Sequence, residues 1–148
     1  MSNHANYRIM PELNLILECC KGRATVEDAI QMKKAEIADE LYDPGFDILV
    51  DFHEFKTMIE PKIYDSAKRF FNFLSGLNIK GRISIFTAEP SQVVAGMVLK
   101  NLSVVPGSLR IEVYSTIDAA VRRLGIPDES MELVKRNLKS LNESITIA

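Results

Sequence analysis

The sequence predicts an α/β fold: a mixed sheet of about five strands, with an N-terminal antiparallel hairpin, a parallel core and helices on both faces. The first observation is the segment 46–52, which is almost wholly apolar and ends in an acid, as in a parallel strand buried on both faces. The second is the alternation of strand-like and helical patterns after residue 25, which favours βα units with right-handed crossovers. At 148 residues, we expect residues 1–148 to form a single domain.

Two strands are predicted near the N-terminus, at 7–10 and 15–20. The connection between them is too short for a crossover, so they should form an antiparallel hairpin. The second strand carries adjacent cysteines, Cys19 and Cys20. Because neighbouring side chains of a strand point to opposite faces, we expect one buried and one half-exposed thiol, and neither a disulfide nor a metal site.

The first helix is predicted to begin after Thr25, which fits an N-cap position. Asp28 follows three residues later, as in a capping box, and the Asp-Pro-Gly sequence at 43–45 ends the helix. Lys33 and Lys34 interrupt the apolar stripe of this helix, which predicts that it packs on one side only.

A second helix is predicted from Pro61, a residue that suits the first helical position, after a loop or a first helical turn at 53–59. A strand at 83–86 follows it. The apolar residues of the helix that begins at Pro61 recur at the spacing of a core-facing stripe. This stripe consists of Ile63, Ala67, Phe70, Phe71, Leu74 and Leu77.

The segment 91–102 is predicted to be a helix that is apolar around most of its girth, which requires burial on more than one side. Three roles are open: a core helix beneath the final helix, a homodimer interface, or one wall of an apolar pocket. The strand that follows, at 109–114, alternates apolar and polar residues and should lie toward a sheet edge. Helices at about 115–125 and 128–141 complete the chain.

Composition excludes several classes of function. The net charge of −2 argues against a nucleic-acid partner, which would require a basic stripe. The chain has no run of about 18 apolar residues, so we expect no transmembrane segment. The N-terminal residues do not resemble an export signal, which predicts a cytoplasmic protein.

Asp51 is the sharpest candidate for chemistry, because it ends the central strand at the edge where ligands and phosphoryl acceptors often lie. Together with Thr87 it resembles the phosphoacceptor arrangement of response-regulator receivers. That mechanism also needs an acid pair that holds Mg²⁺ and a lysine after the last strand. Cys19-Cys20-Lys21 and Tyr114-Ser115 stand at those places, so we expect Asp51 to organise the following loop.

Other catalytic and binding patterns are not found in the sequence. Asp51, His53 and Glu54 are interpreted as a surface polar cluster, because strand alternation would place Glu54 on the opposite face from the other two. No glycine-rich phosphate loop, nucleophile elbow or Cys-His pair occurs. We therefore expect no catalytic residues, no metal and no cofactor, and hence no enzyme.

Four stretches together resemble the SpoIIAA-like proteins of the STAS/SEC14-type α/β superfamily. They are residues 13–22, 25–28, 46–52 and 113–125, the last reading Val-Tyr-Ser-Thr-Ile-Asp-Ala-Ala-Val-Arg-Arg-Leu-Gly. The resemblance implies a non-enzymatic regulatory or protein-interaction module with an unknown protein partner. It also implies, from the SEC14-like relatives, an apolar ligand cleft.

In STAS anti-sigma-factor antagonists, a serine that follows an aspartate after the central strand is reversibly phosphorylated. The Asp-Ser-Ser-Gly motif is absent here at that spacing, and the candidate phosphoacceptors are Asp51, Thr57 and Ser66. Three functions therefore remain open. The first is an interaction module, which in one version forms a homodimer. The second is a carrier of a small apolar, lipid-like ligand, and the third is a phospho-switch. The candidates for an apolar pocket or interface are Phe70, Phe71, Val94, Met97 and Val98.

Overall fold

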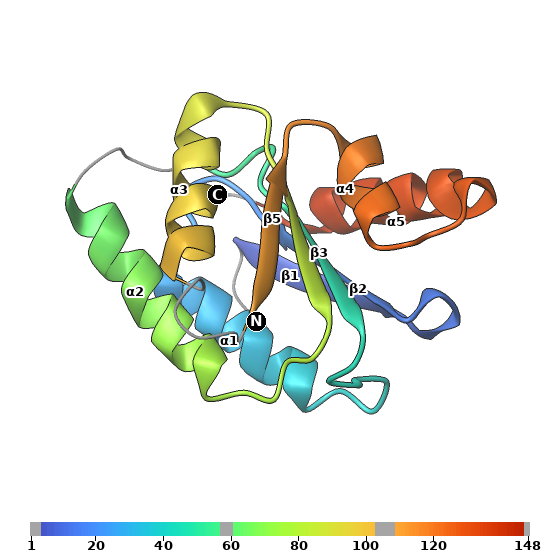
Figure 1. The fold of residues 1–148 in the computed structure, drawn as a ribbon, viewed down its shortest axis with the longest axis horizontal. Coiled ribbons are helices and arrows are strands. Elements are labelled where there is room, and N and C mark those ends of the chain that lie inside the picture. The colour runs from blue at the N-terminus through green and yellow to red at the C-terminus, as the bar shows by residue number, and fades with distance from the viewer. Residues whose placement is uncertain (1–3, 57–60, 103–108, 147–148) are drawn as a thin grey trace.

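The computed structural model of the chain describes residues 4–56, 61–102 and 109–146. Its centre is a five-stranded sheet in which the spatial order of the strands follows the chain (Figure 1). The first pair is antiparallel and the other pairs are parallel, so the predicted mixed sheet with an N-terminal hairpin is confirmed. The strands are β1 (Ala5–Met10), β2 (Leu15–Cys20), β3 (Asp47–Asp51), β4 (Arg82–Phe86) and β5 (Arg110–Tyr114).

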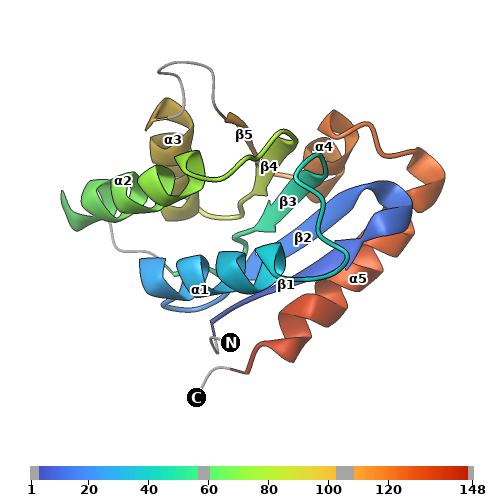
Figure 2. The same ribbon diagram turned by 90° about the horizontal axis from the view of Figure 1, so that it is seen from below.

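Helices cover both faces of this sheet, as predicted. Because β2 to β5 are parallel and adjacent in chain order, crossovers of one hand place all three connecting helices on the same face. Figure 2 shows this group on one side of the sheet and the last two helices on the other. The helices are α1 (Val26–Ile37), α2 (Pro61–Ser75), α3 (Pro90–Leu102), α4 (Ile117–Arg123) and α5 (Met131–Ser144), with short 3-10 turns at Pro11–Leu13 and Asp128–Ser130.

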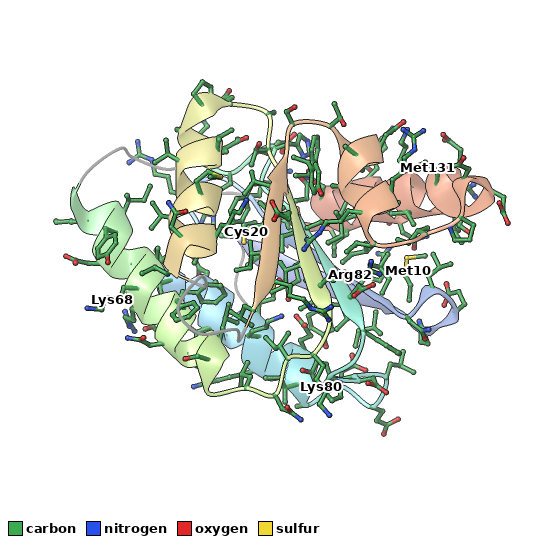
Figure 3. The ribbon with its side chains drawn as sticks, in the orientation of Figure 1. Met10, Cys20, Lys68, Lys80, Arg82 and Met131 are labelled. Carbon is green, nitrogen blue, oxygen red and sulfur yellow. The ribbon has the colours of Figure 1, made fainter. Side chains whose placement is uncertain are left out.

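The sheet separates two hydrophobic cores. One lies between the sheet and α1–α3, and the other lies under α4 and α5, where Figure 3 labels Met10 and Met131. Cys19 belongs to the second core and Cys20 to the first. Both thiols are therefore buried, and the expectation of a half-exposed thiol is wrong because β2 is covered on both faces.

The start of α1 follows the prediction and its buried face does not. The Thr25 N–H donates to Asp28 Oδ2 at 2.8 Å and the Asp28 N–H donates to Thr25 Oγ1 at 3.2 Å, so the capping box is present. The helix ends at Ile37, however, and Ile37 and Leu41 are exposed while Lys33 is buried. The lysine that interrupts the apolar stripe thus belongs to the interior.

Of the three roles left open for residues 91–102, that of a core helix beneath the final helix is wrong. Helix α3 contacts β5 and α2, and α5 lies on the other face of the sheet. Gly96 lets α3 approach the sheet closely, because a Cβ at that position would lie 3.0 Å from Val113 Cγ2. Within the described residues, no helix is long and apolar enough to cross a membrane.

Candidate functional site

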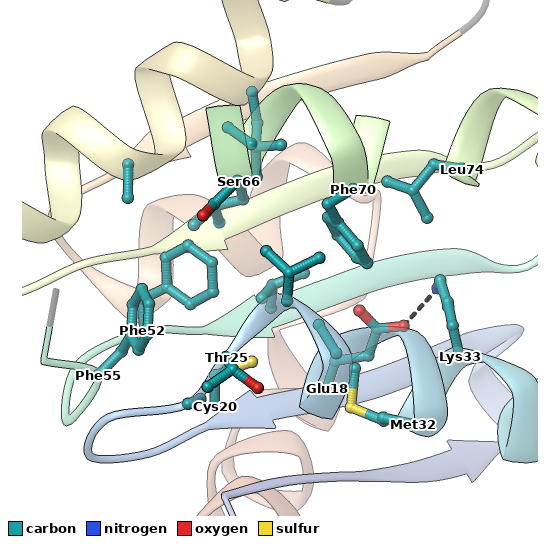
Figure 4. A pocket seen from close by; sticks show the side chains of 18 of the residues that line it. Glu18, Cys20, Thr25, Met32, Lys33, Phe52, Phe55, Ser66, Phe70 and Leu74 are labelled. Atoms are coloured by element: carbon teal, nitrogen blue, oxygen red, sulfur yellow. Dashed lines mark hydrogen bonds and ion pairs between the residues drawn. The ribbon is translucent and has the colours of Figure 1, made fainter. Parts of the chain in front are cut away.

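A cavity of about 480 Å³ lies between the sheet and the three helices α1–α3. This volume is within the range of small-molecule sites in proteins. Its floor is formed by apolar residues of β3, β4 and β5, and its roof by one face of each helix (Figure 4). The apolar lining includes Ile48, Val50, Ile83, Ile85 and Ile111 from the strands, and Met32, Ile63, Phe70, Leu74 and Leu99 from the helices.

Small side chains line the cavity from each of the three helices. Ala29 on α1, Ala67 on α2 and Ala95 on α3 all line the cavity. A larger side chain at any of these positions would occupy part of the cavity.

An aromatic pair stands at one end of the cavity, on the loop after β3. The ring centroids of Phe52 and Phe55 are 4.9 Å apart, and both residues line the cavity. The loop is held from two sides. The Lys56 N–H donates to the Gly22 carbonyl at 2.7 Å, and the Gln92 Nε2 donates to the carbonyls of His53 and Phe55 at 3.0 and 2.9 Å.

A buried group of three ionisable side chains forms part of the cavity wall. The Lys33 ammonium donates to Glu18 on β2, and to Glu36 Oε1 at 2.9 Å. Glu18 and Lys33 line the cavity, and Figure 4 shows the bond between them. Glu36 lies behind them and is completely buried.

The environment assigns different protonation states to the two carboxyl groups. Burial opposes the ionisation of Glu18, but the charge of Lys33 and its hydrogen bonds outweigh burial and lower the pKa of Glu18 below its usual value. Burial, reinforced by the negative charge of Glu18, raises the pKa of Glu36 to about 10. Glu36 Oε2 is buried without a hydrogen-bond partner among the described residues, which also disfavours the charged form.

Lys33 stays charged despite its burial. Burial alone would lower its pKa, but the two carboxyl groups, Glu18 first, raise it above the usual value. A charged Glu18, a charged Lys33 and a neutral Glu36 carry no net charge together. This end of the cavity is therefore polar but electrically balanced.

The mouth of the cavity has an excess of positive charge. We define the mouth by the exposed charged residues that line the cavity in the described part of the chain, which are Arg23, Lys56, Lys62, Arg69 and the acidic Glu27. Arg69 on α2 forms an ion pair with Glu27 on α1, and both side chains are more than half exposed. The pair bridges the two helices on the solvent side of the cavity.

The candidates for the apolar pocket are placed unequally by the structure. Phe70 lines the cavity, and Phe71 packs against the same core without lining it. Val94 and Met97 are exposed and Val98 is half-buried, and none of the three lines the cavity. Their neighbours Ala95 and Leu99 line it instead. As a pocket wall, helix α3 is therefore confirmed through other residues than those predicted, and the alternative that Val94, Met97 and Val98 form an interface stays a prediction.

The candidate phosphoacceptors do not converge on one site. Ser66 on α2 is exposed and borders the cavity, whereas Asp51 is buried at the C-terminal end of β3 on the side of α5. Thr57 lies outside the described residues.

Asp51 organises the loop after β3, as expected. Its Oδ1 accepts the His53 N–H at 2.8 Å and lies 2.6 Å from His53 Nδ1. This hydrogen bond, partly opposed by burial, raises the pKa of His53 above its usual value. Glu54 Oε1 lies 3.7 Å from His53 Nε2, so the expectation that Glu54 faces away is wrong, because β3 ends at Asp51 and strand alternation does not continue.

The Asp51–His53 pair faces a second cleft, of about 390 Å³, beside α5. An aspartate that orients an imidazole is the arrangement of many general bases. The cleft wall in the described part of the chain contains no hydroxyl or thiol that such a base could activate. No group of three or more metal-ligating side chains occurs in that part either.

No family model, no curated protein and no solved structure matches this chain. The resemblance to SpoIIAA-like and STAS proteins therefore stays a prediction.

Sequence reasoning missed the buried group around Lys33 and the charge of the cavity mouth. One signal was available for the first: Glu18 is the single charged residue in the apolar strand Leu15–Cys20. A buried carboxylate requires a partner, and Lys33 on the next helix supplies it; Glu36, three residues further along that helix, also pairs with Lys33.

Proposed function

We propose that this protein is a non-catalytic carrier of a small, largely apolar ligand, which occupies the cavity between the sheet and helices α1–α3. The observation that carries the proposal is the cavity itself: about 480 Å³ with walls formed mostly by aliphatic and aromatic side chains. Sites for small molecules are concave and mainly apolar, with few polar groups. The cavity has this composition.

The energetics of the fold support the same proposal. A ligand with an apolar body would remove the apolar walls of the cavity from contact with water, which is favourable in free energy. The polar side chains in the inner wall, Glu18 and Lys33, bond to each other, so an apolar ligand leaves neither of them without a partner. The ligand can therefore enter without a large desolvation cost.

Direct detection of cargo is the first test. The protein is purified without detergent, and its mass is measured under native conditions before and after extraction with organic solvent. We expect an added mass that extraction removes, and apo protein that takes up straight-chain alcohols. Each added methylene should tighten binding about threefold to fourfold until the cavity is filled. Alcohols that bind with no dependence on chain length, or not at all, would contradict the proposal.

A variant that fills the cavity tests its location. Ala67→Leu adds volume on the side of α2 that faces the sheet, and Asn72→Leu makes a comparable change at an exposed position of the same helix. We expect Ala67→Leu to weaken decanol binding about tenfold, since the added side chain competes for the same space. Asn72→Leu should bind as the unmodified protein does. Equal behaviour of the two variants would place the ligand elsewhere.

A second candidate function is self-association through α3. Val93, Val94 and Met97 are exposed large hydrophobic residues on neighbouring positions of this helix. Contiguous exposed apolar groups often mark an interaction surface. If a homodimer forms there, light scattering should give twice the mass of the chain, and Met97→Lys should return the monomer mass. A monomer at high concentration removes this candidate.

A further inference from the structure

The mouth of the apolar cavity differs in charge from the rest of the chain. Among the described residues, its charged side chains are those of Arg23, Lys56, Lys62 and Arg69, with Glu27 as the acidic one, whereas the whole chain has a net charge of −2. A mainly apolar ligand gives no reason for this concentration of positive charge. A ligand that also carries a negative group does.

The basic residues reach the mouth from three different elements, so the concentration is not a by-product of one helix. Arg23 follows β2, Lys56 follows β3, and Lys62 and Arg69 lie on α2. Among the described residues, Arg23, Lys56 and Lys62 form no ion pair, and Arg69 pairs with Glu27. Their charges are thus available to a group that arrives from solution.

The other end of the cavity offers no comparable attraction for an anion. Lys33 is already bonded to Glu18 and Glu36. An anionic group placed there would meet the negative charge of Glu18 and would lose its hydration without gaining an unpaired cation. The charges therefore orient a ligand with its anionic end at the mouth and its apolar chain under the helices.

We infer that the ligand is an anionic amphiphile, with an apolar chain and a carboxylate or phosphate head. This inference rests on the proposed carrier function and specifies its ligand. When the ligand binds, Arg69 releases Glu27 and binds the head group instead. A guanidinium can bind carboxylate and phosphate oxygens with two parallel hydrogen bonds. Glu27 covers that site in the unliganded protein and competes with the ligand for it.

Calorimetric titration with matched ten-carbon ligands tests the inference. The probes are decanoate, decyl phosphate and 1-decanol, each kept below its aggregation concentration, with the intact protein in low salt and in high salt. We expect one or both anions to bind about tenfold more tightly than decanol, with the difference shrinking in high salt. Preference between decanoate and decyl phosphate then identifies the head group.

Two outcomes would overturn the inference in different ways. If decanol binds as tightly as both anions, the ligand is neutral, and the carrier function stands without the anionic head. If none of the three binds, the carrier function fails and the inference fails with it. Decanol binding thus separates the two proposals.

Variants with opposite expected effects locate the head group. Arg69→Gln should weaken decanoate binding about twofold to fivefold, and Glu27→Gln should strengthen it by a similar factor. Neither should change decanol binding. The control is Lys68→Gln, an exposed basic residue on the same helix that does not line the cavity. If Lys68→Gln has the same effect as Arg69→Gln, only the overall charge matters and the assigned site is wrong.

Discussion

Lys33 on α1 and Glu18 on β2 form an ion pair whose side chains are only 3% and 5% exposed. Two charges so far from water are stable only when each is well compensated. Glu36 completes the arrangement by accepting a second hydrogen bond from Lys33 at 2.9 Å. The pair ties the first helix to a strand in the middle of the fold, beside the cavity that the helix helps to enclose.

Removal of the Glu18 carboxyl group and removal of the Glu36 carboxyl group should have very different effects on the free energy of unfolding. Glu18→Gln leaves the buried charge of Lys33 without its anion, so we expect a loss of about 3–5 kcal/mol in the free energy of unfolding. Glu36→Gln replaces a neutral acid by a neutral amide of the same shape and should cause no loss; at neutral pH it should stabilise the protein, because the amide has no proton that unfolding would release. Urea denaturation at neutral pH measures both, and equal losses would show that the negative charge is not on Glu18.

The raised pKa of Glu36 should make stability depend on pH in a definite direction. The folded protein keeps this proton up to a pKa of about 10, whereas the unfolded chain releases it near the ordinary value. The folded state therefore binds more protons in that window, and this group's contribution to stability is lost as pH rises. Glu36→Gln removes that dependence. The free energy of unfolding of the variant, relative to that of the unmodified protein, should therefore increase from about pH 6 to about pH 9. A constant difference across that range would contradict the protonation of Glu36.

The hydrogen bond between the His53 ring and the Asp51 carboxylate should govern the titration of His53. It raises the pKa of His53, so the stability from this pair is present below the ordinary histidine pKa and is lost as pH rises through the folded value. Because the His53 side chain is 36% exposed, the effect on stability should stay below about 1 kcal/mol. In NMR titrations, Asp51→Asn should lower the His53 pKa and Glu54→Gln should change it less. An unchanged titration in Asp51→Asn would refute the assigned role.

Gln92 should be essential for the loop that carries Phe55. Its side chain, 1% exposed, donates to the carbonyls of His53 and Phe55 and accepts the N–H groups of Ala88 and Glu89. Gln92→Leu leaves these groups unpaired in the interior and should cost about 1–3 kcal/mol. Hydrogen exchange should accelerate at residues 53–56. Gln31→Leu, at an exposed position of α1, is the control and should leave both measurements unchanged.

Local patterns predicted the fold because each of them has a single structural solution. The four residues between β1 and β2 cannot make a crossover, and the apolar run that ends at Asp51 fits a strand covered on both faces. Thr25 and Asp28 form a capping box within one turn of helix. Such features depend on neighbours in sequence, so the sequence alone is sufficient for them.

The site depends on contacts that sequence patterns do not contain. Any rule that separates charged from apolar residues places Lys33 on the solvent-exposed face of its helix. The partner that makes its burial possible, Glu18, lies on a different element. The orientation of α3 could not be predicted either, because a helix that is apolar all round has no preferred face. The close contact of Gly96 with Val113 sets that orientation, which turns Ala95 inward and Met97 outward.

Methionine methyl NMR tests the central claim most directly, because the chain carries its own controls. Met32 lines the cavity, Met10 and Met131 lie in the core on the opposite face of the sheet, and Met97 is exposed. In a titration of the intact protein with decanoate, we expect the Met32 methyl signal to shift until it saturates while the Met10 and Met131 signals stay in place. A Met32 signal that does not move, or a shift confined to Met97, would show that the cavity between the sheet and α1–α3 is not the binding site.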